Sequence, residues 1–275
     1  MILVIGANGM LGHDLMKVLE GDVRGLDLPE IDITSFESVR RVLLTLKPKI
    51  IINAAAYTDV DGCETNVEQA MAVNGEGVGL LALAAREIGA KLVQISTDYV
   101  FDGSKGSPYL EDDAVGPLSI YGESKLAGEL NAAMAPAHLI VRTQWLYGVH
   151  GKNFVETMLR LGSEKSELSV VDDQIGSPTW SYDLALAIKA LLDSGCRGTY
   201  NAANSGYCSW NEFAKAIFVE VGLKIAVNSM STKELNRPAN RPLYSTLDCS
   251  KLEQDTGFKP QGWREALREY LKLRS

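Results

Sequence analysis

The chain has 275 residues, of which 46% are hydrophobic and 23% charged, a balance typical of a globular protein with one large domain or two small ones. Its 27 basic and 35 acidic residues give a formal net charge of −8, which argues against a general nucleic-acid binder or a binder of anionic membranes. No apolar run approaches the length of a membrane span and no basic leader precedes the first one, so we expect a cytoplasmic protein. The four cysteines are scattered and the three histidines lack metal-ligand spacing, so we expect neither disulfides nor a catalytic metal.

A glycine-rich segment follows the first apolar run. The run Ile2–Ile5 ends at Gly6-Ala7-Asn8-Gly9-Met10-Leu11-Gly12, and a helical pattern continues through Leu19. Glycines allow a backbone to approach a pyrophosphate closely, and the N-terminus of a helix offers N–H groups to the anion. Glycines also serve plain tight turns, but a strand before them and a helix after them favour a dinucleotide-binding loop. The predicted cofactor contacts from this loop are Gly6, Asn8, Gly9, Met10, Leu11 and Gly12.

An acid at the end of the second predicted strand bears on the choice of cofactor. Val23–Asp27 is interpreted as a strand, and an acid at its end commonly binds the ribose hydroxyls of the adenosine. The Asp27 carboxylate would repel the 2′-phosphate of NADPH, and no Lys or Arg follows within Leu28–Ile33. We therefore expect NADH to be preferred, with NADPH left open. The alternative interpretation of Asp27 is an exposed loop acid with no contact to the cofactor. Asp32 and Ile33 are further predicted cofactor contacts.

Strands and helices alternate through the first half of the chain. This alternation predicts an α/β fold with a Rossmann-like doubly wound parallel sheet over residues 1–143. Residues 144–275 are expected to form mainly a smaller substrate-binding lobe, part of which returns to the sheet. Small residues after the third strand, which leave room for a flat cofactor ring, are Ala54, Ala55 and Ala56. The later elements expected in this half are strands at Ile50–Asn53, Lys91–Ser96 and His138–Arg142 and helices at Phe36–Leu46 and Glu68–Ile88.

A tyrosine and a lysine one helical turn apart carry the candidate chemistry. Tyr121 and Lys125 would share one face of a helix, where an ammonium would lower the pKa of a phenol towards neutrality. The pair alone is weak evidence for a catalytic site, because an exposed surface helix can show the same spacing. The hydroxyl of Thr97, at the end of a predicted strand, could polarise the same carbonyl oxygen. Ligands bind beyond the carboxyl ends of parallel strands, so the glycine loop, Ala54–Ala56 and Thr97 should converge on one crevice.

These motifs resemble those of the extended short-chain dehydrogenases/reductases. Within that group the chain is similar to the dTDP-4-dehydrorhamnose reductase family, on the segments Ser96–Phe101, Val141–Trp145 and Asp173–Gln174 with Pro178–Thr179. The resemblance implies reduction of the C4 ketone of dTDP-4-dehydro-L-rhamnose to give dTDP-L-rhamnose, with NADH or NADPH as the hydride donor. It makes Tyr121 the proton donor and Thr97 the group that orients the carbonyl, while Lys125 holds the nicotinamide ribose and lowers the Tyr pKa.

The resemblance also implies residues that meet the substrate. Asp98 and Trp145 match positions that contact the sugar, although a Trp after a strand is more often a core residue. Arg241 is the predicted contact to the substrate pyrophosphate, because a guanidinium forks onto phosphate oxygens; pairing with a protein acid is the alternative. Asn153 is a weaker prediction for a polar contact to the same ligand.

Some members of the resembled family form homodimers around Mg²⁺ held by acidic side chains. Asp14 matches one such position, but Tyr182 stands where a second acid is expected, so Mg²⁺ and the homodimer remain open expectations. Two other functions also stay open. One is a non-catalytic regulatory subunit similar to that of methionine adenosyltransferase. The other is an epimerase, or a reductase of another nucleotide 4-keto-6-deoxy sugar.

Overall fold

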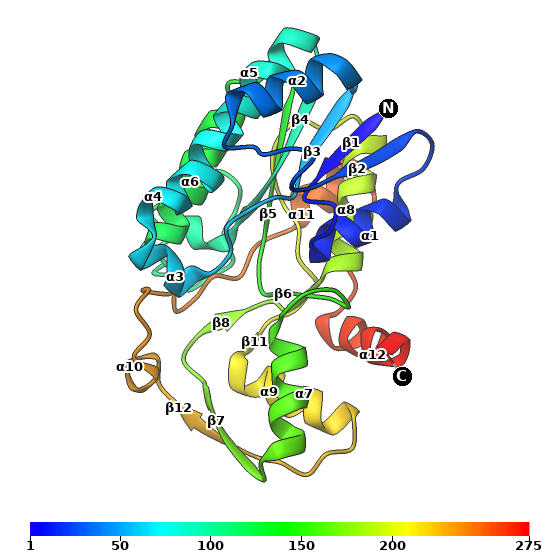
Figure 1. The fold of residues 1–275 in the computed structure, drawn as a ribbon. Coiled ribbons are helices and arrows are strands. Elements are labelled where there is room, and N and C mark those ends of the chain that lie inside the picture. Colours follow the sequence, from blue (N-terminus) through cyan, green and yellow to red (C-terminus); the bar gives the residue numbers. More distant parts are fainter. Residues whose placement is uncertain (275) are drawn as a thin grey trace.

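A six-stranded parallel sheet forms the centre of the larger unit in the computed structural model, which describes residues 1–274 (Figure 1). The strand order is β10-β5-β4-β3-β1-β2, and the order reverses between β1 and β3. This reversal places a ligand-binding crevice at the carboxyl ends of β1 and β3. The predicted Rossmann-like α/β fold is thus confirmed. The strands are β1 (Ile2–Ile5), β2 (Val23–Leu26), β3 (Ile50–Asn53), β4 (Lys91–Thr97), β5 (His138–Thr143) and β10 (Gly198–Asn201).

Helices cover both faces of the sheet because its central strands are apolar on both sides. Leu3 and Ile51 belong to the core on one face, whereas their neighbours Val4 and Ile52 belong to the core on the other. The first face is covered by α2 (Phe36–Leu46), α5 (Gly77–Ile88) and α6 (Ile120–Ala132), and the second by α1 (Met10–Val18), α8 (Ser181–Asp193) and α11 (Ser250–Thr256) (Figure 1).

The long helix expected over Glu68–Ile88 contains a change of helix type. The segment is built from α4 (Val67–Ala70), a π-helical stretch at Met71–Glu76 and α5. Before it lies the short helix α3 (Val60–Thr65). The π-helical stretch places Asn74 against Tyr57, whose backbone N–H donates to the Asn74 side-chain oxygen Oδ1 at 2.8 Å. A local departure from α-helical geometry thus anchors the segment that follows the end of β3.

The smaller unit is an α/β lobe with its own aromatic core. The parallel pair β7 (Glu167–Val171) and β12 (Ala226–Met230) packs with α7 (Phe154–Glu164), α9 (Trp210–Glu220) and α12 (Trp263–Arg274). Ser209 caps α9 in a capping box with Glu212. Two-residue pairs join this lobe to the sheet: β6 (Leu146–Tyr147) with β9 (Thr179–Trp180), and β8 (Ile175–Gly176) with β11 (Cys208–Ser209). The short helix α10 (Thr232–Leu235) follows β12.

The second half of the chain contributes to both units. Strand β10 and helices α8 and α11 belong to the sheet unit, whereas α7, α9 and α12 lie in the lobe (Figure 1). The chain therefore crosses between the units several times, and these crossings bring residues from both units to the carboxyl edge of the sheet. Among residues 1–274, every helix is too short or too polar to span a lipid bilayer.

Candidate active site

Two adjoining cavities lie along the carboxyl edge of the sheet and share Gly9 and Ala54–Ala56. The first, of about 320 Å³, is called here the glycine-loop cavity; its wall includes Gly6, Asp27, Asp32, Ile33 and Val73. The second, of about 480 Å³, is called the tyrosine cavity; its wall includes Met10–Gly12, Thr97, Asp98, Tyr121, Lys125 and Trp145. Most residues predicted for the cofactor and the substrate therefore lie along one continuous surface.

The glycine loop brings three backbone segments too close together for side chains. Gly6 has φ +79°, and a Cβ on it would lie 2.6 Å from the Ala55 nitrogen. A Cβ on Gly12 would lie 2.2 Å from the Gly6 carbonyl oxygen. Gly9 precedes α1 without any capping side chain, and the first-turn residues Met10–Gly12 line the tyrosine cavity. An uncapped helix N-terminus behind a glycine cradle fits the pyrophosphate of a dinucleotide.

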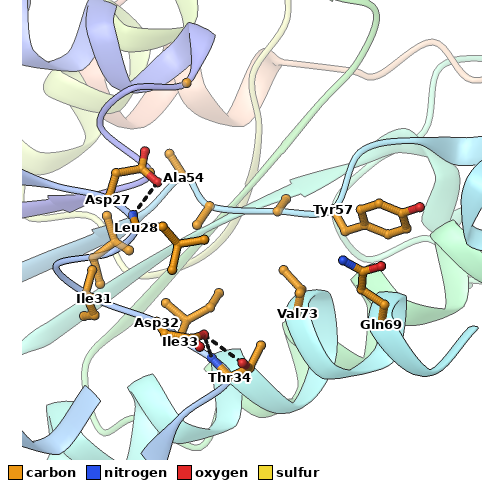
Figure 2. A pocket seen from close by; sticks show the side chains of 15 residues that line it. Asp27, Leu28, Ile31, Asp32, Ile33, Thr34, Ala54, Tyr57, Gln69 and Val73 are labelled. Atoms are coloured by element: carbon orange, nitrogen blue, oxygen red, sulfur yellow. Dashed lines mark hydrogen bonds between the residues drawn. The ribbon is translucent and has the colours of Figure 1, made fainter. Parts of the chain in front are cut away.

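Acidic side chains line the glycine-loop cavity (Figure 2). The Asp27 carboxylate accepts hydrogen bonds from the N–H groups of Asn8 (3.0 Å) and Leu28 (2.8 Å). The Asp32 carboxylate accepts from the backbone N–H and the hydroxyl of Thr34, at 2.9 and 2.7 Å. Neither Lys nor Arg is among the described residues that line this cavity. The wall therefore suits neutral ribose hydroxyls better than an added phosphate.

Thr97, Tyr121 and Lys125 meet in the tyrosine cavity. Thr97 ends β4, and Ser119 caps the start of α6 so that Tyr121 lies in its first turn. The Thr97 hydroxyl donates to the Asp98 carboxylate at 2.9 Å, and Tyr121 lines the same cavity. Lys125 is buried, and its ammonium donates to the Ile95 carbonyl at 2.6 Å. A carbonyl oxygen in this cavity could thus meet two hydroxyl groups.

The protonation of Tyr121 differs from the sequence-based expectation. Removal from solvent raises the pKa of Tyr121 above its usual range, and the charge of Asp98 raises it further. Burial lowers the pKa of Lys125 to about 8, against an opposing effect of Glu129. The predicted lowering of the Tyr121 pKa by Lys125 is therefore wrong for this structure, since desolvation and a nearby carboxylate dominate. Tyr121 is a neutral phenol at physiological pH.

Asp98 is a buried acid beside these hydroxyl groups. Its side chain is 1% exposed, and burial raises its pKa to about 6, although hydrogen bonds from Ser245 and Thr97 act in the opposite direction. A raised carboxyl pKa means that the folded state binds more protons than the unfolded state between the two values. Stability therefore falls as pH rises through this interval.

The Asp98→Asn variant isolates this titration. Below pH about 4 the acid is protonated in both states, and above about 6 it is ionised in both, so its full cost appears only above about 6. The free energy of unfolding of the variant, relative to wild type, should increase as pH rises from about 4 to about 6 and then level off. Urea denaturation across this range measures the difference. A difference independent of pH would contradict a raised Asp98 pKa.

Arg241 and Asn153 lie away from the walls of both cavities. Arg241 pairs with Asp61 at 3.0 Å and donates to the Ala239 carbonyl, as the alternative interpretation anticipated. A side-chain hydrogen bond connects it to Tyr99, which lines the tyrosine cavity. Asn153 caps α7 and donates to the Gly148 carbonyl at 2.8 Å. Both side chains are committed to protein contacts, so their roles as substrate contacts stay predictions.

Sequence reasoning missed several residues that line the tyrosine cavity. Thr143 ends β5 as Thr97 ends β4, and Gln144 comes next, so the rule about carboxyl ends of strands would have found them. Gln144 is 2% exposed, and its side-chain oxygen Oε1 accepts from the Ser177 N–H at 3.0 Å. Lys152 also lines the cavity, from the loop before α7, and a loop residue of this kind carries no signal in a single sequence.

The structure offers no support for the expected Mg²⁺ site. Within residues 1–274, no group of three or more His, Cys, Asp or Glu side chains could hold a metal ion. The Asp14 carboxylate is buried and accepts from Lys17 (3.1 Å) and from the Ser181 hydroxyl (2.5 Å). Its oxygens are occupied by neighbours from α1 and α8, so Mg²⁺ at a dimer interface gains no support from Asp14.

Comparisons with known proteins agree along the whole chain. A family model described as the RmlD substrate binding domain matches residues 1–275. The spore coat polysaccharide biosynthesis protein SpsK of Bacillus subtilis is 46% identical over 278 residues, covering 100% of this chain and 98% of that protein. A crystal structure of a dTDP-4-dehydrorhamnose reductase from Clostridium acetobutylicum has a TM-score of 0.97 and 44% identity, covering 99% of each chain. A dTDP-4-dehydrorhamnose reductase from Bacillus anthracis in complex with NADP has a TM-score of 0.96 and 42% identity, covering 99% of this chain and 98% of that one.

Proposed function

This chain belongs to the dTDP-4-dehydrorhamnose reductase family, and from that premise we propose that it reduces the C4 ketone of dTDP-4-dehydro-L-rhamnose to give dTDP-L-rhamnose. One observation carries the proposal. Thr97, Tyr121 and Lys125 line one cavity that adjoins a glycine cradle, so a phenolic proton donor and a second hydroxyl lie beside a loop suited to a dinucleotide.

Each residue has a part in this reaction. When bound, a reduced nicotinamide would supply the hydride. The Tyr121 phenol donates its proton to the oxygen that becomes the C4 hydroxyl, and solvent later restores that proton. The Thr97 hydroxyl turns from Asp98 to the bound carbonyl oxygen, orients it and stabilises the negative charge that develops on it. Lys125 is expected to bind the nicotinamide ribose, and the α1 N–H groups the pyrophosphate. Asp98 and Trp145 line the tyrosine cavity, and we expect them to contact the sugar.

The reaction is tested by turnover of the purified protein. We expect stoichiometric oxidation of NADH or NADPH with dTDP-4-dehydro-L-rhamnose, and dTDP-L-rhamnose as the product identified by NMR. Tight cofactor binding without turnover would instead support a regulatory subunit. Turnover with a different nucleotide 4-keto-6-deoxy sugar would change the substrate. The identity to SpsK, whose name refers to a spore coat polysaccharide, makes such sugars the first alternatives to assay. Product formation without net cofactor consumption would indicate an epimerase.

The preference for NADH is a further proposal, supported by Asp27 and by the lack of basic side chains among the described lining residues. The Bacillus anthracis relative in complex with NADP makes the comparison of cofactors informative. We expect kcat/KM to favour NADH in the wild type, and Asp27→Ser to shift the ratio towards NADPH by at least about tenfold, because like charges in contact are costly. Glu37→Gln is the matched control, since Glu37 is exposed and does not line the cavity. Equal efficiency with both cofactors in the wild type would contradict the preference.

A further inference from the structure

The indole of Trp145 lies in a narrow slot. On one side its ring stacks on Trp210, with the ring centroids 3.6 Å apart and the planes inclined by 9°. On the other side is Gly176, where an added Cβ would lie 2.5 Å from the Trp145 ring. Trp145 itself has φ +47°, a backbone conformation that is uncommon for a bulky residue and marks strain held by its surroundings. The ring therefore cannot move towards either neighbour.

Hydrogen bonds fix the segment that holds Gly176 relative to Trp145. The Thr179 N–H donates to the Trp145 carbonyl at 3.2 Å, and the Ser177 N–H donates to the Gln144 side chain at 3.0 Å. These bonds join the segment that holds Gly176 to the segment that holds Trp145. Gly176 also pairs with Cys208, two residues before Trp210. All three members of the slot are thus tied into the short strands between the sheet and the lobe.

A chain of side-chain hydrogen bonds fixes the position of the Trp210 indole. The indole N–H donates to the side-chain oxygen Oε1 of Gln174 at 3.2 Å, and the side-chain Nε2 of Gln174 donates to the Thr232 hydroxyl at 2.9 Å. The Asp173 carboxylate accepts from the Thr232 N–H and hydroxyl. The sequence segment Asp173–Gln174, which the proposed reaction leaves without a part, is therefore the support of the aromatic stack. Phe154 adds a contact to Trp210 with ring centroids 4.5 Å apart.

We propose that Trp210, supported by Gln174 and opposed by Gly176, is a positioning residue that holds the Trp145 indole at the sugar face of the tyrosine cavity. The inference rests on the proposed function for the nature of the ligand. A fixed aromatic wall loses little conformational freedom when a sugar binds, whereas a free indole must be ordered at each binding event. Trp210 thus acts on substrate affinity through Trp145 and not through the proton transfer at Tyr121.

The test combines kinetics with circular dichroism. Stacked indoles couple, so the wild type should show a far-ultraviolet exciton couplet that disappears in Gly176→Ala, where both tryptophans remain but the added Cβ displaces one. Trp210→Leu should raise KM for dTDP-4-dehydro-L-rhamnose by about 3- to 10-fold with kcat unchanged. Trp210→Phe keeps a flat ring against Trp145 and should restore a KM near that of the wild type.

A double-mutant cycle decides whether Trp210 acts through Trp145. In a Trp145→Ala background, Trp210→Leu should leave KM unchanged. Additive effects of the two substitutions on KM, or a Gly176→Ala variant with the couplet and KM of the wild type, would overturn the proposal. A wild type without turnover would contradict the proposed reaction. In that case the affinity for dTDP-L-rhamnose from calorimetry replaces KM in the same variants, with the same expected and contrary results.

Discussion

Tyr121→Phe is expected to lose about 10²–10⁴-fold in turnover, the usual contribution of a general acid. The substitution removes one hydroxyl group and keeps the ring that packs edge to face on Tyr99, with centroids 5.4 Å apart. The fold and the glycine cradle should therefore be unchanged, and cofactor affinity should stay near that of the wild type. The loss should appear equally in kcat and kcat/KM, because the missing proton transfer belongs to the transition state.

Tyr147→Phe serves as the control for loss of a phenolic hydroxyl. Tyr147 is fully buried away from both cavities, and its hydroxyl has no hydrogen-bond partner among residues 1–274. Its variant should turn over at the wild-type rate. Single-turnover kinetics for both variants, with cofactor binding followed by fluorescence titration, make the comparison. A Tyr121→Phe enzyme with the rate of the wild type would remove Tyr121 from the mechanism.

The sheet and its ligand-binding edge could be predicted from sequence because their signals are local. Buried parallel strands have short apolar sequences. The bounds expected for the first five strands therefore agree with the structure to within one residue at each end. The glycine spacing then placed the loop after β1, and the rule about carboxyl ends placed Thr97 near it. The geometry of the two cavities agrees with that convergence.

The interactions that were not predicted depend on contacts distant in sequence. Arg241 pairs with Asp61 across 180 positions, and no local pattern distinguishes this pair from a phosphate contact. The pKa of Tyr121 depends on burial and on Asp98, which the spacing of Tyr121 and Lys125 does not reveal. The strands β8 and β11 have two residues each, too few to show a period. The Trp145 slot is built on these short strands.

Glu129→Gln is expected to lower the free energy of unfolding by about 3–5 kcal/mol, the cost of breaking a buried ion pair by removing one charge. Glu129 and Arg142 form this pair at 2.7 Å, and both side chains are only 6% exposed. The same carboxylate accepts from the Ser96 hydroxyl at 2.5 Å, directly before Thr97. An amide in its place keeps the volume but leaves the guanidinium charge buried without a counter-ion.

The pair between Arg40 and Glu87 provides the matched control. These side chains are 50% and 46% exposed, so Glu87→Gln should cost no more than about 1 kcal/mol. Urea denaturation of the two variants measures both values, and equal small losses would show that the Glu129–Arg142 pair contributes no more than a surface pair. A second effect distinguishes the Glu129 variant from the Glu87 variant. The Glu129 charge raises the pKa of Lys125, so loss of that charge should move the Lys125 pKa further below about 8. Less Lys125 is then protonated at pH 8, and cofactor affinity there should fall in Glu129→Gln and not in Glu87→Gln.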